Sequence, residues 1–269
     1  MSVAPAAHVL ILGGTAEARA LAAELVAAGR VVVSSLAGRV RDPALPDGEV
    51  RIGGFSTAEL NGVEGLAAYL SDRHIGAVVD ATHPFAAHIS ANAAAAAART
   101  GTPLLRLQRA GWRDHPDADH WTWVASVDEA VSASARSRRP FLTTGRQSLD
   151  RFLPWADRDV TVRVVDPPEF PLPERWRLIR SRGPYAYADE LTLMREAGSD
   201  LLVTKDSGGT HTAAKLDAAG ELGVPVVVIG RPASPPDVPQ VATVDDVLVW
   251  LDRHPARGSG VDPRDRQAP

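Results

Sequence analysis

A glycine-rich turn near the start of the chain combines groups that bind phosphate. Gly13, Gly14 and Thr15 follow the apolar run His8–Leu12 and precede a helical pattern that carries Glu17 and Arg19. Glycines let a backbone approach a ligand closely, and the first N–H groups of a helix attract a phosphate. The spacing is not G-x-G-x-x-G, so a plain tight turn fits as well. A carboxylate at Glu17 would repel a pyrophosphate, and we expect it to contact a ribose, a ring or Arg19.

A second candidate follows the β-branched run Val31–Leu36. At this point of a dinucleotide-binding fold, an acid binds the ribose 2′-hydroxyl, whereas an arginine accommodates a 2′-phosphate. Here Ser35, Gly38 and Arg39 occupy the position, and no acid occurs before Asp42. If a dinucleotide binds, the phosphorylated form therefore fits better. Solvated surface arginines are the alternative.

The third candidate, Asp80–Phe85, places several polar groups and a ring on one turn between a strand and a helix. His83 precedes Pro84, so we expect it in extended geometry at the cap of a helix that has Pro84 at its first position. An imidazole can donate or accept a proton near neutral pH. In the alternative interpretation, Asp80 only accepts backbone N–H bonds and His83 only caps the helix.

Three turns in the second half of the chain carry cations beside glycines. Thr143–Arg146 ends an apolar strand and supplies a guanidinium that can hold a carboxylate by two hydrogen bonds. Arg182–Tyr185 adds a cation and a ring, and Thr204–Thr210 precedes a helical pattern with Lys215. The last of these turns has the composition of an anion cradle, although a surface ion pair on a plain turn is the alternative.

Short apolar strands alternate with helices along the whole chain, which predicts an α/β fold with parallel sheets covered on both faces. We expect two doubly wound, Rossmann-like domains at residues 1–125 and 126–254, and a disordered tail at 255–269. The expected strands are His8–Leu12, Val31–Leu36, Ile75–Val79, Leu104–Leu107, Phe141–Thr144, Val160–Val165, Leu201–Thr204 and Val224–Ile229. The expected helices begin near Thr15, Ser56 or Thr57, His83, Val127, Ser148, Tyr187, His211 and Val244.

The composition narrows the function classes. The 269 residues carry 29 basic and 33 acidic side chains, a net charge of −4, which does not favour a nucleic acid partner. The chain has no cysteine, which removes disulfides, thiolate metal sites and a cysteine nucleophile. No membrane span, secretory leader or metal-binding cluster is recognisable, so we predict a cytoplasmic protein without a bound metal. The Tyr-x-x-x-Lys pair of short-chain dehydrogenases is also missing.

Taken in order from about residue 8 to 254, these turns resemble the precorrin-6A reductase family of cobalamin biosynthesis. The resemblance rests on the Leu-Ile-Leu-Gly-Gly-Thr-Ala-Glu-Ala-Arg segment, Arg51–Phe55, Asp80–Phe85, Thr143–Arg146, Arg182–Tyr185, the Thr204–Gly209 loop and Val228–Pro232. It implies NADPH-dependent reduction of one double bond of the precorrin-6A macrocycle, giving precorrin-6B, by two Rossmann-like domains that flank a cleft. It also allows contact with other enzymes of the pathway for hand-over of the tetrapyrrole substrate.

The resemblance and the turns together assign a role to each candidate residue. We expect NADPH to be bound by Gly13, Gly14, Thr15, Glu17, Arg19, Ser35, Gly38, Arg39, Gly54, Phe55 and Thr82. We expect the substrate carboxylates and ring to be bound by Phe85, Arg146, Arg182, Tyr185, Lys205, Asp206, Ser207, Gly208, Lys215 and Arg231. His83 is the candidate proton donor.

Three alternatives to this hypothesis stay open. The chain could reduce the cobalt-containing analogue of precorrin-6A, which these motifs do not distinguish from the metal-free substrate. It could be an NADPH-dependent reductase of some other substrate. It could also be a non-catalytic, flavodoxin-like protein that binds a nucleotide through the same anion loops.

Overall fold

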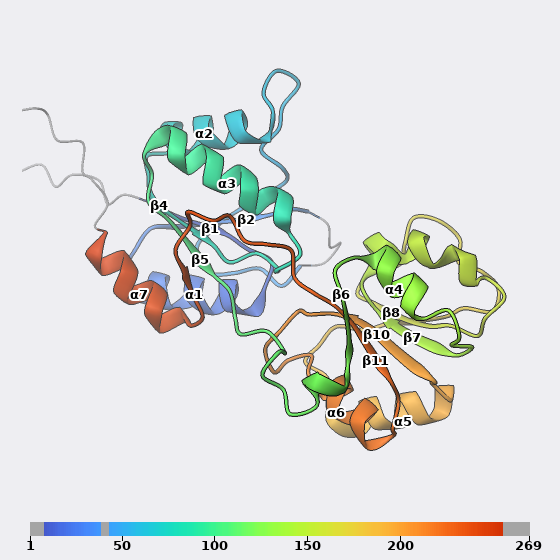
Figure 1. Cartoon of the computed structure of the whole chain (residues 1–269). Helices are drawn as coiled ribbons and strands as arrows, with labels where there is room; N and C mark the ends of the chain where they lie inside the picture. The colour runs from blue at the N-terminus through green and yellow to red at the C-terminus, as the bar shows by residue number, and fades with distance from the viewer. Residues whose placement is uncertain (1–7, 39–42, 255–269) are drawn as a thin grey trace, which may run out of the picture. The chain divides into compact units, whose positions relative to one another are not determined.

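The computed structural model describes residues 8–38 and 43–254. They form two compact units. The first unit contains the described residues up to Arg109 and those from Ala233 onward, and the second unit is Ala110–Pro232. Each unit is built on a six-stranded sheet with helices packed against it (Figure 1).

The sheet of the first unit has its first strand in the centre. Its order is β12-β5-β4-β1-β2-β3, and every neighbouring pair is parallel. The strands are β1 (His8–Leu12), β2 (Val32–Leu36), β3 (Glu49–Ile52), β4 (Ile75–Asp80), β5 (Leu104–Leu107) and β12 (Gln240–Val241). The helices are α1 (Ala16–Ala27), α2 (Gly62–Asp72), α3 (Ala87–Thr100) and α7 (Val244–Arg253). The strand order reverses between β1 and β4, which is where doubly wound folds bind ligands.

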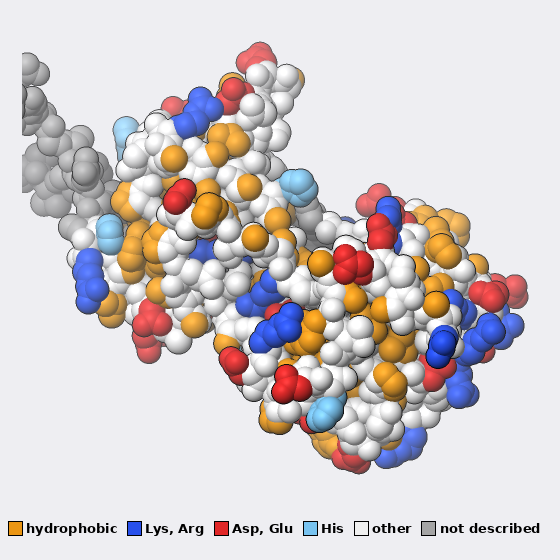
Figure 2. All heavy atoms as spheres, in the orientation of Figure 1, with side chains coloured by type: hydrophobic (Ala, Val, Ile, Leu, Met, Phe, Trp, Pro, Cys, Tyr) orange, Lys and Arg blue, Asp and Glu red, His pale blue; other side chains and the backbone are white. Residues whose placement is uncertain are grey.

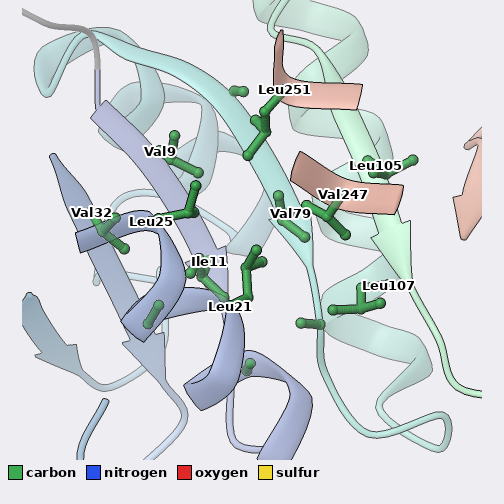
Figure 3. Close-up of a cluster of buried hydrophobic side chains, with 14 residues drawn as sticks. Val9, Ile11, Leu21, Leu25, Val32, Val79, Leu105, Leu107, Val247 and Leu251 are labelled. Atoms are coloured by element: carbon green, nitrogen blue, oxygen red, sulfur yellow. The ribbon is translucent and has the colours of Figure 1, made fainter. Parts of the chain in front are cut away.

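Alternation along β1 divides the core of this unit between the two faces of the sheet. Val9 and Ile11 belong to a cluster with α1 and α7 (Figure 3), whereas Leu10 and Leu12 belong to a cluster with α2 and α3. Side chains of successive strand residues point to opposite faces, so a strand that is apolar throughout must be covered on both. The apolar runs in the sequence are therefore explained by helices on either side.

The second unit repeats this strand order. Its sheet reads β6-β11-β10-β7-β8-β9, so β7, β8, β9, β10 and β11 take the places that β1 to β5 take in the first unit. The strands are β6 (Thr122–Val124), β7 (Pro140–Thr143), β8 (Thr161–Val164), β9 (Arg177–Arg180), β10 (Leu201–Lys205) and β11 (Val226–Ile229). The α-helices are α4 (Val127–Ala133), α5 (Tyr187–Ala197) and α6 (Ala214–Glu221), and two 3₁₀ helices are η1 (Ala118–His120) and η2 (Arg146–Trp155).

The predicted α/β class with two doubly wound, parallel-sheet halves is confirmed, but the chain is divided between them differently. Residues 110–125, predicted to lie in the first domain, belong to the second unit. Helix α7 and strand β12, predicted to lie in the second domain, belong to the first. The reason is tertiary: β12 pairs with β5, and Val247 and Leu251 of α7 pack on α1 (Figure 3). The predicted tail, 255–269, lies outside the described residues.

Two helices of the first unit begin later than predicted. Helix α2 begins at Gly62 rather than near Thr57, because Asn61 and Glu64 form a capping box. Helix α3 begins at Ala87 rather than at Pro84, because the His83 ring accepts the Phe85 N–H at 3.3 Å and closes a separate turn. The sequence also did not predict β6, β9 and β12, which are short edge strands.

Charged side chains of both signs are interspersed on the face of the molecule that Figure 2 shows. None of the helices within residues 8–38 and 43–254 is long and apolar enough to cross a membrane. The same residues contain no group of three or more His, Asp or Glu side chains that could hold a metal ion.

Gly65 of α2 packs closely against the backbone of Phe55, in the turn after β3. A Cβ at Gly65 would lie 1.8 Å from the Phe55 carbonyl oxygen, far inside van der Waals contact. Alanine normally stabilises a helix interior relative to glycine by about 0.5–1 kcal/mol, whereas overpacking costs about 1–3 kcal/mol or more. The steric cost therefore exceeds the helix propensity, and the turn must shift.

We predict that Gly65→Ala lowers the thermal unfolding temperature, measured by circular dichroism. The matched control is Gly220→Ala in α6, whose Cβ would meet a carboxylate oxygen of Asp117 at 2.9 Å, the end of a side chain that can rotate away. The control should be neutral or stabilising. Equal effects of the two substitutions would contradict the steric explanation.

Candidate functional site

Thr15 joins the two turns at the centre of the first sheet. Its Oγ1 accepts the Ala18 N–H at 3.1 Å and so caps α1, and it donates to the Ala81 carbonyl oxygen at 2.8 Å. Ala81 follows β4, and its own N–H donates to Leu12 O at 2.9 Å. The turns after β1 and β4 are therefore held together at the point where the strand order reverses.

Gly14 presents an open stretch of backbone beside this junction. Its φ is +114°, a conformation that favours glycine, and a Cβ built on it would meet no atom within 4 Å. The backbone is therefore open beside Gly14, two residues before α1, and the first N–H groups of a helix have no partners within the helix. This geometry suits an anion such as a phosphate.

Glu17 forms an ion pair that the sequence did not predict. Its Oε2 lies 2.7 Å from Nη1 of Arg109, the residue that ends the first stretch of this unit, and the two side chains are 22% and 19% exposed. The sequence favours a ribose, a ring or Arg19 as the partner of Glu17. The pair places a guanidinium beside the carboxylate, so the negative charge at the start of α1 is compensated. Arg19 is half-buried on the same helix.

The turns after β2 and β3 are tied together by Arg51. Its Nη1 donates to Ser35 Oγ at 2.7 Å and to Gly53 O at 3.1 Å, and its Nη2 donates to Gly54 O at 2.7 Å. Its guanidinium carbon lies 3.9 Å from the ring centroid of Phe55. Phe55 is 8% exposed and belongs to the core, so it lines the turn from behind. Burial lowers the pKa of the Arg51 guanidinium.

Two further predicted residues lie at or near the end of β2. Gly38 has a φ of +71°, and a Cβ there would lie 3.0 Å from Ile52, so the turn passes close to β3. Arg39 lies outside the described residues.

The turn after β4 is organised by a buried carboxylate. Asp80, which is 3% exposed, accepts bonds from Thr82 N at 3.1 Å and Thr82 Oγ1 at 2.6 Å, and it lies 3.7 Å from Nη1 of the buried Arg106. Thr82 is half-buried, and His83 is exposed. The His83 and Phe85 rings are 5.9 Å apart. Asp80 therefore shapes the turn, whereas Thr82, His83 and Phe85 reach its surface.

The turn after β7 in the second unit resembles the turn after β1. Gly145 has a φ of +80°, and a Cβ on it would meet no atom within 4 Å. Within the described residues, the buried Oγ1 of Thr144 has no hydrogen-bond partner. Arg146 is half-buried and donates to Pro167 O at 3.3 Å. Open glycine backbone, a hydroxyl and a guanidinium thus meet at the carboxyl edge of this sheet.

The loop after β10 lies next to that turn and is held by Asp206. The Asp206 side chain is 6% exposed, accepts the Trp112 N–H at 3.1 Å and lies 3.2 Å from Nε of Arg231. Arg231 also donates to Asp206 O at 3.0 Å and to Ala110 O at 3.2 Å. A Cβ at Gly208 would lie 2.2 Å from the Ala110 carbonyl oxygen, a backbone atom, so only glycine fits at this position.

Two other predicted residues of this loop, Lys205 and Ser207, are more exposed than Asp206. Lys205 and Ser207 are half-buried, and Ser207 Oγ lies 3.1 Å from Thr212 Oγ1. Burial lowers the pKa of the Lys205 ammonium. The surface of the loop therefore includes Lys205, Ser207 and Gly209, whereas Asp206 and Gly208 are buried.

Lys215 lies in the interior, although the sequence analysis expects it to contact substrate. It is 3% exposed, donates to Thr212 O at 2.5 Å and stacks on Trp112, 4.5 Å from the ring centroid. Burial and, to a smaller extent, the charge of Arg163 lower the pKa of the Lys215 ammonium to about 7, against the opposing effect of Glu190.

Arg163 and Glu190 form a buried ion pair that sequence reasoning missed. Glu190 Oε2 has no hydrogen-bond partner among the described residues. Arg163 also lies over the ring of Tyr185, 3.7 Å from its centroid, and the Tyr185 hydroxyl donates to Ser181 O at 3.0 Å. Arg182 is exposed. Tyr185 and Arg182 follow the edge strand β9, and the Tyr185 N–H donates to His211 O at 3.3 Å, so this turn lies beside the segment that leads from β10 to α6.

The fold and these turns define a class: an α/β protein with two doubly wound units, each with an open glycine turn where its strand order reverses. The family model described as precorrin-6x reductase CbiJ/CobK matches residues 8–252. The chain therefore belongs to the precorrin-6x reductase family. It is accordingly an oxidoreductase of cobalamin biosynthesis, as the sequence motifs predicted.

Individual relatives agree with this assignment. The chain is 49% identical to a precorrin-6A reductase of Rhodococcus erythropolis, over 91% of this chain and 97% of that protein. It is 31% identical to a cobalt-precorrin-6A reductase of Priestia megaterium, over 83% of this chain and 90% of that protein. A solved structure of CobK precorrin-6A reductase matches with a TM-score of 0.85 and 41% identity, covering 95% of this chain and all of that one.

We predict that Lys215 makes the stability of the protein depend on pH. Its folded pKa of about 7 lies below the ordinary value of 10.5, so between these values the unfolded chain binds more protons than the folded one. The free energy of unfolding should therefore increase by up to ~1.4 kcal/mol per pH unit as the pH rises from about 7 toward 10.5. The unfolding temperature should rise with it.

Thermal unfolding of the wild type and of Lys215→Met between pH 7 and 9.5 measures this effect. The methionine variant should show a flatter pH dependence than the wild type. Lys205→Met is the comparison and should remove less of the slope, because Lys205 is less buried. Identical slopes for the wild type and Lys215→Met would exclude the proposed titration.

Proposed function

We propose that this chain reduces one double bond of metal-free precorrin-6A to give precorrin-6B, with NADPH as the reductant. One observation carries the choice of substrate. Proteins named precorrin-6A reductase are 42–49% identical to this chain, whereas proteins named cobalt-precorrin-6A reductase are 27–31% identical. The cobalt-containing analogue is the second candidate, because it is the substrate named for those more distant relatives.

The residues at the first sheet fit a phosphorylated dinucleotide. The open backbone at Gly14 and the capped start of α1 would hold the pyrophosphate, beside Thr15 and the Glu17–Arg109 pair. Ser35, Gly38 and Arg39 would lie by the 2′-phosphate, and the turns with Gly54 and Thr82 would border the rest of the nucleotide. When bound, NADPH supplies a hydride from nicotinamide C4. The role of the chain is to bind and orient it.

The second unit fits the carboxylates of the tetrapyrrole. Arg146, Arg182 and Lys205 provide cations, and Ser207 and Gly208 belong to the loop that would receive an acetate or propionate group. Phe85 and Tyr185 are the proposed ring contacts. Asp206 and Lys215 are buried, and the half-buried Arg231 is bound to Asp206, so we assign all three to positioning the loop. Hand-over of substrate from other enzymes of the pathway and a cytoplasmic location stay predictions.

The test is turnover by the purified protein. With NADPH and precorrin-6A, we expect loss of absorbance at 340 nm to proceed together with a change in the macrocycle spectrum. The cobalt-containing analogue should be reduced more slowly at equal concentration. Binding of NADPH without reduction of either macrocycle would contradict the proposed reaction.

His83 is the proposed donor of the proton that the carbon next to the hydride acceptor needs. Its Nδ1 accepts the Phe85 N–H, so in the neutral ring the proton lies on Nε2, and the side chain is exposed. His83→Asn keeps an acceptor for the Phe85 N–H but has no proton to transfer. We predict that kcat falls about 10²- to 10⁴-fold while NADPH affinity stays unchanged.

His88→Asn is the matched control, because His88 is an exposed histidine on the adjacent helix α3. Its kcat should equal that of the wild type. Unchanged turnover in His83→Asn would remove His83 from the mechanism and leave water or a substrate carboxyl as the donor.

A further inference from the structure

We propose that Arg51 of β3 binds the 2′-phosphate of the ribose and so determines a preference for NADPH over NADH. This inference rests on the proposed function, because it concerns the same dinucleotide. The sequence alone favours Arg39 as the ligand of the 2′-phosphate and does not single out Arg51. The assignment of Arg51 comes from its position, its unused donors and its uncompensated charge.

The position of Arg51 is set by the register of the sheet. Ser35 of β2 pairs with Arg51 of β3, near the carboxyl ends of both strands. The end of the second strand is where doubly wound folds bind the ribose of a dinucleotide, and an arginine there accommodates a 2′-phosphate. The bond from Arg51 Nη1 to Ser35 Oγ, 2.7 Å long, places the guanidinium at that end.

The contacts of Arg51 orient its guanidinium but use only some of its N–H donors. An arginine has five N–H donors in a fixed plane. Among the described residues, the hydrogen bonds of Arg51 go to the Ser35 hydroxyl and to the carbonyl oxygens of Gly53 and Gly54. One face of the guanidinium lies over the Phe55 ring. The group is thus held rigidly, while two of its five donors remain for a ligand.

Among the described residues, Arg51 differs from four other arginines of the first unit in that a carboxylate does not neutralise its charge. Arg30, Arg73, Arg106 and Arg109 each form an ion pair, with Asp252, Glu49, Asp80 and Glu17 respectively. No carboxylate within the described part of the chain forms an ion pair with Arg51, which contacts neutral oxygens and aromatic rings instead. A preorganised cation without a counter-charge suits a phosphate dianion.

The test compares nucleotides that differ only in the 2′-phosphate. NADPH and NADH binding to the full chain is measured by the fluorescence of the reduced nicotinamide, and 2′,5′-ADP is compared with 5′-AMP as a competitor. In Arg51→Met, we expect NADPH affinity to fall about 10- to 100-fold, the range for a hydrogen bond to a charged group. NADH affinity should change less than about twofold. Arg51→Lys should keep part of the preference, because it keeps the charge but not the planar donors.

Arg73→Met is the matched control. Arg73 also lies beside Tyr69, 5.9 Å from the ring centroid, but it pairs with Glu49 at the opposite end of β3. It should leave the affinities for both nucleotides unchanged. Circular dichroism of each variant checks that the fold is retained.

The outcomes separate this inference from the proposed function. If the wild type prefers NADPH and Arg51→Met weakens both nucleotides by the same factor, Arg51 only builds the turn and the inference fails. An unchanged preference in Arg51→Met also overturns it, and a loss confined to Arg39→Ala would assign the phosphate to Arg39 alone. If the wild type does not prefer NADPH, the cofactor assignment in the proposed function fails as well.

Discussion

The reversal of strand order at the centre of each parallel sheet is the constraint on which both candidate sites depend. In the first unit, β1 is flanked by β2 and β4, so the chain leaves neighbouring carboxyl ends in opposite directions and exposes backbone between them. The bond from Thr15 Oγ1 to Ala81 O, 2.8 Å long, fixes the two turns relative to each other. β7 and β10 take the corresponding places in the second unit. In the described part of each unit, a Cβ built on Gly14 or Gly145 at these positions would meet no atom within 4 Å.

Ion pairs of buried carboxylates hold the turns after β4 and β10, and a third such pair joins β8 to α5. Asp80 with Arg106, Glu190 with Arg163 and Asp206 with Arg231 each join segments that are distant in the sequence. A buried pair adds little stability over apolar packing, but removal of one partner leaves an uncompensated charge that costs about 3–5 kcal/mol. These pairs therefore act as tight geometric constraints. The groups proposed to meet ligands are less buried and lie in front of them.

Local sequence patterns predicted the strands of the sheet centres and the turns that follow them, because apolar runs and glycines are local features. They could not predict the partners of Arg51 or Arg109, which depend on strand register and on a contact 92 residues away. The sequence predicts that Phe55 and Lys215 contact ligands. In the structure, α2 packs over the turn that contains Phe55, and Trp112 lies against Lys215, so both side chains are buried. β9 has an exposed arginine at each end and β12 has only two residues, so neither leaves an apolar run in the sequence.

The return of the chain to its first unit has a consequence for synthesis on the ribosome. The second unit is continuous, from Ala110 to Pro232, so it can fold as soon as this stretch has emerged. The first unit starts earlier but finishes later, because β5 lacks its neighbour β12 and α1 lacks its cover α7 until residues 240–253 are made. Until then, an unpaired strand edge and part of an apolar face are exposed, and both are features that favour aggregation of a nascent chain.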